Sequence, residues 1–214
     1  MEILAIDIGG THIKILASGQ TEPRKFPSGT TMTPQNMVEG VLELAQGWTY
    51  EAVSMGYPGV IKKGKIVTEP HNLGQGWVGF NFEAAFKLPV KIMNDAAMQA
   101  LGSYRDGILL FLGLGTGLGS AIIDDGAVLP LEVGHLSYKK GTYEDYIGLR
   151  GLKRLGKKKW QKHVAYGVER LRAAVNPDDV VLGGGNSKKL KKLPEGCRLG
   201  DNEFAFTGGF RMWE

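Results

Sequence analysis

Two segments of this chain share one pattern, and the repetition limits the folds open to it. Residues 3–17 (ILAIDIGGTHIKILA) and 108–124 (ILLFLGLGTGLGSAIID) each contain an apolar run, a turn with glycine and threonine, and a second apolar run. Short apolar runs joined by a glycine loop predict a β-hairpin. Because the pattern occurs twice, we expect two lobes of related design, an N-terminal lobe of residues 1–105 and a C-terminal lobe of residues 106–214.

The other segments alternate between helix and strand patterns, which predicts the α/β class. A Thr-Pro pair opens a helix over residues 33–45, because threonine caps a helix and proline suits its first turn. Residues 90–101 (VKIMNDAAMQAL) read as a strand that passes directly into a helix. Residues 151–175 have helical apolar spacing with a break at Gly156, and residues 178–187 (DDVVLGGGNS) predict a buried strand that ends in a glycine loop.

The composition excludes several classes of protein. An apolar fraction of 43% and a charged fraction of 22% over 214 residues are typical of a globular protein with a real core. No apolar run approaches the roughly 18 residues of a membrane-spanning helix. The N-terminus also lacks a secretory signal pattern, so we expect a cytoplasmic protein with no membrane partner. The single cysteine, Cys197, excludes an intramolecular disulfide and a cysteine-rich zinc site.

Much of the formal net charge of +4 comes from two lysine runs. Residues 157–159 read KKK and residues 188–192 read KKLKK. Such runs are either solvated faces or a track for a polyanion. Aromatic residues do not alternate with these lysines along the chain, which gives little support to binding of single-stranded nucleic acid.

The two glycine turns have the chemistry of phosphate-binding loops without matching the common nucleotide motifs. Residues 112–120 (LGLGTGLGS) contain neither the Gly-Lys-Ser/Thr of a P-loop nor a complete G-x-G-x-x-G. Successive glycine N–H groups and a threonine hydroxyl can still form a nest for an anion. An acid beside such a nest repels phosphate unless a cation bridges the two, so Asp7 predicts Mg²⁺ at the first turn. The alternative is that both are tight hairpin turns with incidental threonines.

Two other stretches carry polar residues whose roles the residues alone leave open. Asp95 either caps the helix that follows it or acts as a general base at a strand end, where open α/β sheets present ligands. Residues 131–146 read LEVGHLSYKKGTYEDY. Four roles stay open for Glu132, His135 and Glu144 in this stretch. They are metal ligands, a catalytic base with its partners, a polar clamp for a ligand, or ordinary surface residues.

Six motifs occur in order along nearly the whole chain: DIGGTHIK (7–14), GYPGVI (56–61), NDAAMQALG (94–102), LGLGTGLGS (112–120), LEVGH (131–135) and VVLGGGNSKK (180–189). In this order they resemble the motifs of ROK-family sugar kinases, and within that family the polyphosphate/ATP glucokinase type. The resemblance implies an actin-like (ribonuclease H-like) two-lobed fold, with the sugar and the phosphoryl donor in the cleft between the lobes. It also implies a homodimer.

The resemblance assigns roles to matching positions of this sequence. The phosphate-binding residues that it implies are Gly9, Gly10, Thr11 and Lys14 in the first turn and Gly115, Thr116 and Gly117 in the second. The sugar-binding residues that it implies are Asn72, Asn94, Asp95, Glu132, His135 and Glu144, with Asp95 also the catalytic base. The nucleotide-binding residues that it implies are Gly183, Gly184 and Gly185. Asp7 belongs to the first motif and would hold Mg²⁺, the expected cofactor.

This sequence departs from the family pattern at two places. Most family members bind a structural zinc through three cysteines and a histidine, but between His135 and Glu144 this chain has LSYKKGTY, so no zinc is expected. The sequence also begins at its first strand, without the helix-turn-helix extension of the family's repressors. We therefore expect no specific nucleic-acid partner.

The resemblance implies a kinase that transfers a phosphoryl group from polyphosphate, ATP or both to the 6-hydroxyl of glucose. Asp95 would accept the proton of the attacking hydroxyl, while Mg²⁺ and the two turns would neutralise charge on the phosphates. Two alternatives stay open. One is a catalytically silent sugar-binding regulator of the same fold, and the other is a kinase for another hexose such as N-acetylmannosamine, mannose or fructose.

Overall fold

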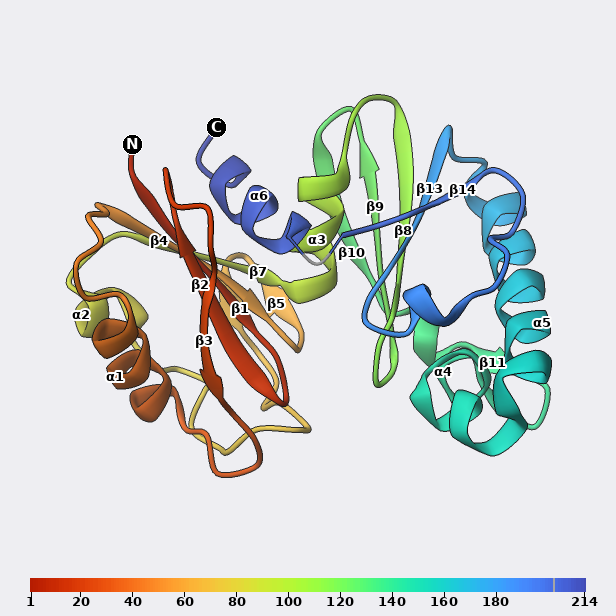
Figure 1. Cartoon of the computed structure of the whole chain (residues 1–214), viewed down its shortest axis with the longest axis horizontal. Helices are drawn as coiled ribbons and strands as arrows, with labels where there is room; N and C mark the ends of the chain where they lie inside the picture. Colours follow the sequence, from red (N-terminus) through yellow and green to blue (C-terminus); the bar gives the residue numbers. More distant parts are fainter. Residues whose placement is uncertain (202) are drawn as a thin grey trace. The chain divides into compact units, whose positions relative to one another are not determined.

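The computed structural model describes residues 1–201 and 203–214, which form two compact units (Figure 1). Unit 1 contains Met1–Met98 and Ala205–Glu214, and unit 2 contains Gln99–Phe204. The C-terminal helix α6 (Phe204–Arg211) packs against the strands of unit 1, where Ser54 Oγ donates a hydrogen bond to Gly209 O at 2.5 Å. The division expected from the sequence places this helix with the C-terminal lobe instead. The contact has no local sequence signal, because it joins residues far apart in the chain.

The sheet of unit 1 has five strands in the order β3-β2-β1-β4-β7. They are β1 (Ile3–Ile8), β2 (His12–Ala17), β3 (Arg24–Pro27), β4 (Ala52–Tyr57) and β7 (Val90–Asn94). Neighbours among β1, β2 and β3 are antiparallel, whereas β4 runs parallel to β1 and β7 parallel to β4. The hairpin predicted at the first glycine turn is therefore confirmed. β1 and β4 are buried at every position, as expected for central strands covered on both faces.

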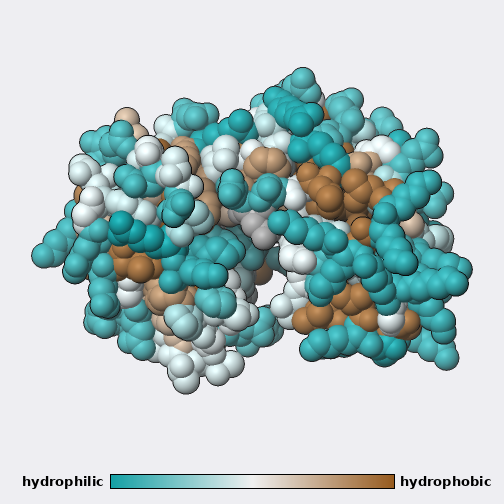
Figure 2. All heavy atoms as spheres, viewed as in Figure 1, coloured by the Kyte–Doolittle hydropathy of each residue, from teal (hydrophilic) through white to brown (hydrophobic). Residues whose placement is uncertain are grey.

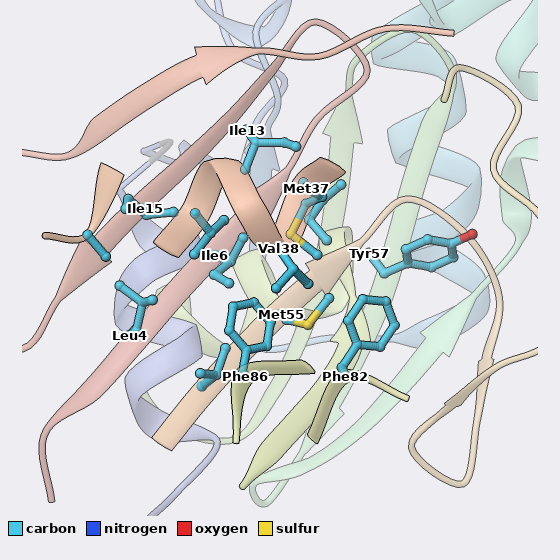
Figure 3. Close-up of a cluster of buried hydrophobic side chains, with 14 of the residues drawn as sticks. Leu4, Ile6, Ile13, Ile15, Met37, Val38, Met55, Tyr57, Phe82 and Phe86 are labelled. Carbon is cyan, nitrogen blue, oxygen red and sulfur yellow. The ribbon is translucent and has the colours of Figure 1, made fainter. Parts of the chain in front are cut away.

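Two helices and a small hairpin complete unit 1. They are α1 (Pro34–Leu44), α2 (Phe82–Phe86), β5 (Ile61–Lys62) and β6 (Lys65–Ile66). The predicted start of α1 is confirmed, since Thr33 is its N-cap and its side chain accepts a hydrogen bond from Asn36 N at 3.2 Å. Figure 3 shows Met37 and Val38 of α1 close to Met55 of the sheet, and all three are buried in one core.

The sheet of unit 2 repeats the design of the first. Its strands are β8 (Ile108–Leu114), β9 (Leu118–Asp124), β10 (Ala127–Leu131), β13 (Asp179–Gly183) and β14 (Cys197–Leu199), in the order β10-β9-β8-β13-β14. Counted in chain order within each five-stranded sheet, both sheets have the strand order 3-2-1-4-5. The repetition expected from the two glycine turns is confirmed, because each turn joins the first two strands of its sheet.

The remaining elements of unit 2 are helical except for one hairpin. They are η1 (Val133–His135), β11 (Ser137–Tyr138), β12 (Gly141–Thr142), α4 (Tyr143–Ile147), α5 (Leu149–Val175) and η2 (Ser187–Lys189), while α3 (Asp95–Ser103) runs from unit 1 into unit 2. The predicted break in α5 is confirmed, since Gly156 has a φ of 72° and a ψ of 158°. Figure 1 shows α4 and β11 beside the N-terminal half of α5.

Hydrophilic residues cover most of the face drawn in Figure 2. Among residues 1–201 and 203–214, no helix combines the length and the apolar character needed to cross a membrane.

Candidate active site

The first glycine turn joins β1 to β2 and has a charged pair at its base. Asp7 and Lys14 face each other in the β1–β2 register, and Lys14 Nζ donates to Asp7 Oδ2 at 2.9 Å. The Asp7 side chain is only 12% exposed, so its charge needs the partner that Lys14 supplies. One carboxylate fits Mg²⁺ where substrate phosphates and waters supply the other ligands. In the described part of the chain, no three His, Cys, Asp or Glu side chains gather as a metal site.

Asn72 lies against the first turn. A Cβ on Gly10 would stand 2.9 Å from the Cβ of Asn72, so only glycine at position 10 permits this approach. Ser28 closes the turn, because its Oγ donates to Gly9 O at 2.6 Å and its N donates to Thr11 O at 3.0 Å. The structure thus places Asn72 beside the first turn, and its role as a sugar contact stays a prediction.

Asn94 and Asp95 stand where β7 passes into α3. Asn94 Oδ1 accepts hydrogen bonds from Ala96 N at 3.0 Å and Ala97 N at 3.1 Å, which is the bonding of a helix N-cap. Asp95 is the first residue of α3, and its Oδ1 accepts from Ala96 N at 2.8 Å. The capping role considered for Asp95 therefore falls to Asn94. The helix N-terminus favours the ionised form of the Asp95 carboxylate.

The parallel strands bring three motifs of unit 1 to one edge of its sheet. Asp7 pairs with Gly56 in the β1–β4 register, and Gly56 pairs with the residue before Asn94 in β7. Asp7 on β1 and Asp95, just after β7, are separated by the one strand between them, β4, so β1 and β7 lie on the order of 10 Å apart. Asn94 Nδ2 donates to Gly59 O at 3.2 Å, which ties the Pro-Gly loop to this edge. Open α/β sheets bind ligands at such carboxyl edges.

The second glycine turn is held by the glycine loop that follows β13. Asn186 N donates to Leu114 O and Asn186 Nδ2 donates to Gly115 O, both at 2.9 Å. Gly184 has a φ of 77°, and a Cβ there would lie 2.7 Å from the Leu114 backbone. Only glycine fits this approach. The second turn and the loop of residues 183–185, predicted as separate phosphate and nucleotide sites, therefore form one assembly.

Glu144 reaches the second turn from α4. A Cβ on Gly117 would lie 2.6 Å from Glu144 Oε2, so the carboxylate occupies the space that a side chain at position 117 would need. Gly134 is buried, and a Cβ on it would lie 2.9 Å from Leu118 O and 3.6 Å from the Cβ of Glu144. The E-x-G-H segment therefore packs against both the second turn and α4.

Glu132 and His135 are neighbours on the surface of unit 2. His135 Nδ1 lies 3.9 Å from Glu132 Oε2, and the side chains of His135 and Glu132 are 64% and 53% exposed. An exposed pair at this distance contributes little to stability. Its exposure leaves polar atoms accessible to a ligand, on the same segment that packs against Glu144. The structure brings these three predicted sugar contacts onto adjoining elements, and their binding to sugar stays a prediction.

Aromatic packing orders the hairpin β11–β12, which follows the E-x-G-H segment. Tyr138 stacks on Tyr143 with ring centroids 4.8 Å apart, and its hydroxyl lies 2.9 Å from His163 Nδ1 of α5. Thr142 and Asp145 form a capping box that starts α4 directly after the hairpin. Hydrogen bonds from the backbone and hydroxyl of Thr142 lower the pKa of the Asp145 carboxyl.

Two residues of the second-turn assembly were absent from the sequence-based site. Asn186 bonds to the turn, and Lys189 Nζ donates to Asn186 Oδ1 at 2.7 Å. Lys189 belongs to the run at 188–192, which the sequence left open between a solvated face and a polyanion track. The only local signal is the glycine loop just before these residues, because their contact with the turn depends on the pairing of β8 with β13.

Two sheets of equal topology, each with a glycine turn between its first two strands, define the actin-like fold. The chain belongs to the ROK family, whose family model matches residues 3–138. The family and the fold class predicted from the sequence are therefore confirmed.

Three similar proteins give the range of relatives. A polyphosphate glucokinase of Mycobacterium leprae is 30% identical over 210 residues, which cover 87% of this chain and 64% of that protein. An N-acetylmannosamine kinase of Salmonella typhimurium is 31% identical over 157 residues, 64% of this chain and 54% of that protein. The chain thus spans less than two thirds of the length of both. The crystal structure of an inorganic polyphosphate/ATP-glucomannokinase from Arthrobacter sp. strain KM is similar with a TM-score of 0.85 and 25% identity, over 99% of this chain and 97% of that one.

Proposed function

We propose that this chain is a sugar kinase that transfers a phosphoryl group from polyphosphate or ATP to the 6-hydroxyl of glucose. The observation that carries the proposal is that Asn94 and Asp95 have different roles at the start of α3. Asn94 caps the helix, so the Asp95 carboxylate is not the cap and is held at the helix N-terminus, where its proton-accepting form is favoured. The names of the mycobacterial and Arthrobacter relatives support the same activity.

In the proposed reaction, Asp95 accepts the proton of the sugar hydroxyl while the hydroxyl oxygen attacks the terminal phosphorus in line. Gly9 N and Gly115 N already donate to His12 O and Gly113 O and shape the two turns. The N–H groups of Gly10, Thr11, Thr116 and Gly117 would bind the phosphates of the donor, and Lys14 would add positive charge at the first turn. Such groups act by positioning and by stabilising charge, which is most of the catalysis in phosphoryl transfer. Asp7 would hold Mg²⁺, which neutralises phosphate charge when bound.

The proposed sugar contacts are Asn72, Asn94, Glu132, His135 and Glu144, which would hydrogen-bond the sugar hydroxyls. Polar groups that lose a partner disfavour analogues without the matching hydroxyl, so these residues would set the choice of hexose. When ATP is the donor, the loop Gly183–Gly185 would lie near its base. The homodimer and the cytoplasmic location expected from the sequence belong to the same proposal.

The test is a coupled assay of sugar phosphate formation with ATP and with polyphosphate. The acceptors are glucose, mannose, N-acetylmannosamine and fructose, each with Mg²⁺ and with a chelator. We expect phosphorylation of glucose with at least one donor, and loss of that activity with the chelator. Folded protein that forms no product with any donor and acceptor refutes the kinase. Calorimetric sugar binding without turnover would establish the silent regulator instead.

A further inference from the structure

A cavity of unit 2 is lined by cations and hydroxyl groups that the proposed reaction does not use. Its volume is about 690 Å³, which lies within the roughly 300–1,000 Å³ of small-molecule sites. Four lining residues are cationic, namely Lys139, Lys159, Lys162 and Arg170, and no carboxylate is among the lining residues. The hairpin β11–β12, α4 and α5 form its walls.

The cations come from two elements that meet in the tertiary structure. Lys139 stands in the two-residue turn of β11–β12, with a φ of 53° that few non-glycine residues adopt. Lys159, Lys162 and Arg170 follow one face of α5, at spacings of three and eight residues. From Lys159 to Arg170 the helix rises by about 16 Å. The positive charge is therefore spread along a line and is not gathered at one point.

Within the described part of the chain, none of these four cations forms an ion pair with a carboxylate. The ion pairs found among residues 1–201 and 203–214 involve other residues. Arg170 Nη1 donates to the Tyr166 hydroxyl at 3.1 Å, and Lys139 Nζ lies 5.9 Å from the centre of the Tyr138 ring. Neither contact neutralises a charge. Like charges gathered without counterions destabilise a fold, and an anion in the cavity relieves that repulsion.

His163 in the wall of the cavity experiences the same positive field. Its pKa is lowered by burial and then by Lys139 and Arg154. When the Tyr138 hydroxyl donates to Nδ1, at 2.9 Å, the ring carries its proton on Nε2, which can then donate to an anion. His163 therefore offers a hydrogen-bond donor beside the line of cations.

The tyrosines of the cavity wall pack among themselves and leave few ring faces for a ligand. Tyr138 stacks on Tyr143 at 4.8 Å and meets the edge of Tyr146 at 5.1 Å, while Arg170 lies 5.6 Å from the centre of the Tyr166 ring. Single-stranded nucleic acids bind by stacking their bases on exposed aromatic faces. Hydroxyl groups and cations instead suit phosphate oxygens.

We propose that this cavity binds a linear chain of condensed phosphate. A line of cations about 16 Å long along α5 suits an extended polyanion better than a single phosphate group. Tyr143 in the cavity wall directly precedes Glu144, the α4 residue that reaches the second turn. The inference concerns binding, so it goes beyond the proposed reaction and does not require that the bound chain be the phosphoryl donor.

The lysine run at 157–159 offers a matched control, because Lys159 lines the cavity and Lys157 and Lys158 do not. The double variant Lys159→Ala/Lys162→Ala removes two cavity charges, and Lys157→Ala/Lys158→Ala removes two charges from the same helix outside the cavity. Calorimetry of the full chain measures binding of linear polyphosphate, orthophosphate, ATP, glucose 6-phosphate and a single-stranded oligonucleotide. Circular dichroism and thermal melting verify that both variants are folded.

We expect the cavity variant to weaken polyphosphate binding by roughly tenfold or more, and the control variant to weaken it by less than about twofold. The polyphosphate affinity of the cavity variant should also depend less on salt concentration. Affinity for orthophosphate, ATP and glucose 6-phosphate should change little. Equal losses in both variants would mean diffuse attraction and overturn the proposal. An oligonucleotide that shows the larger loss, or a dimer that dissociates only in the cavity variant, would also overturn it. If the wild-type chain has no kinase activity but binds polyphosphate in this cavity, only the proposed function is refuted. If the wild-type chain is an active kinase but the cavity variant binds polyphosphate as well as the wild type, only the proposed polyphosphate site is refuted.

Discussion

Separate replacement of Asp95 and Asn94 is expected to affect different properties: the Asp95 variant should lose catalysis, and the Asn94 variant should lose the helix cap. Asp95→Asn keeps the shape of the side chain and an oxygen that can accept from Ala96 N, but it removes the negative charge and the capacity to take a proton. Asn94→Ala removes the oxygen that accepts from Ala96 N and Ala97 N, and the amide that donates to Gly59 O.

The structure gives different magnitudes for the two changes. Loss of the Asn94 cap lowers the free energy of unfolding by about 1–2 kcal/mol. For a chain of this size that corresponds to a decrease in Tm of roughly 2–8 °C. Loss of the Asp95 charge at the helix N-terminus costs only about 0.3–1 kcal/mol. Loss of a general base lowers kcat by about 10²–10⁴-fold, or about 3–5 kcal/mol of transition-state stabilisation.

Thermal unfolding and steady-state sugar phosphorylation, measured on the same preparations, separate the two effects. We expect Asp95→Asn to unfold near the wild-type temperature, to bind sugar nearly as well, and to lose most of its kcat. Asn94→Ala should unfold earlier and raise the sugar KM, since Asn94 is also a proposed sugar contact. If Asp95→Asn retained near-wild-type kcat and unfolded as early as Asn94→Ala, Asp95 would be a structural residue and the reasoning would be wrong.

Three further predictions follow from single contacts. Gly117→Ala should displace the Glu144 carboxylate and raise the sugar KM more than Gly115→Ala does. A Cβ at position 117 would lie 2.6 Å from Glu144 Oε2, whereas a Cβ at position 115 meets nothing within 4 Å. Equal changes in KM would contradict this prediction. His163 should titrate below its ordinary pKa of 6.5 in an NMR titration, since burial and neighbouring cations disfavour its charged form. Because the unfolded chain then binds the proton more readily, this residue should lower stability as pH falls from about 6.5 toward the depressed pKa, and a midpoint at or above 6.5 would refute the effect. Cys197, whose pKa burial raises to about 11, should react slowly with iodoacetamide in the native protein at mildly alkaline pH and much faster after unfolding.

Local signals were sufficient for several parts of the fold. The two glycine turns predicted two hairpins, Thr33 and Pro34 predicted the start of α1, and Gly156 predicted the break in α5. Each of these features depends on the backbone preferences of a few neighbouring residues. They could be predicted because no distant partner decides them.

Contacts between distant segments could not be predicted in the same way. Residues 94 and 95 both have side chains that can cap a helix, and only the hydrogen bonds of the folded chain show that Asn94 is the cap. Asn186 reaches Gly115 across 71 residues of sequence, and the loop that carries it is positioned by the pairing of β13 with β8. Helix α6 likewise packs against β1 and β4, whose Ala5 and Ser54 lie beside Gly209.

Local patterns and the spacing of motifs were enough to predict the α/β class, the repeated hairpins and the family. Which residues share a site depends instead on contacts between distant segments. The tertiary structure set Glu144 against Gly117 and Asn72 against Gly10, and it gathered the cations of α5 with Lys139 around one cavity. The physical reason is that strand pairing and core packing, and not proximity in sequence, bring these side chains together.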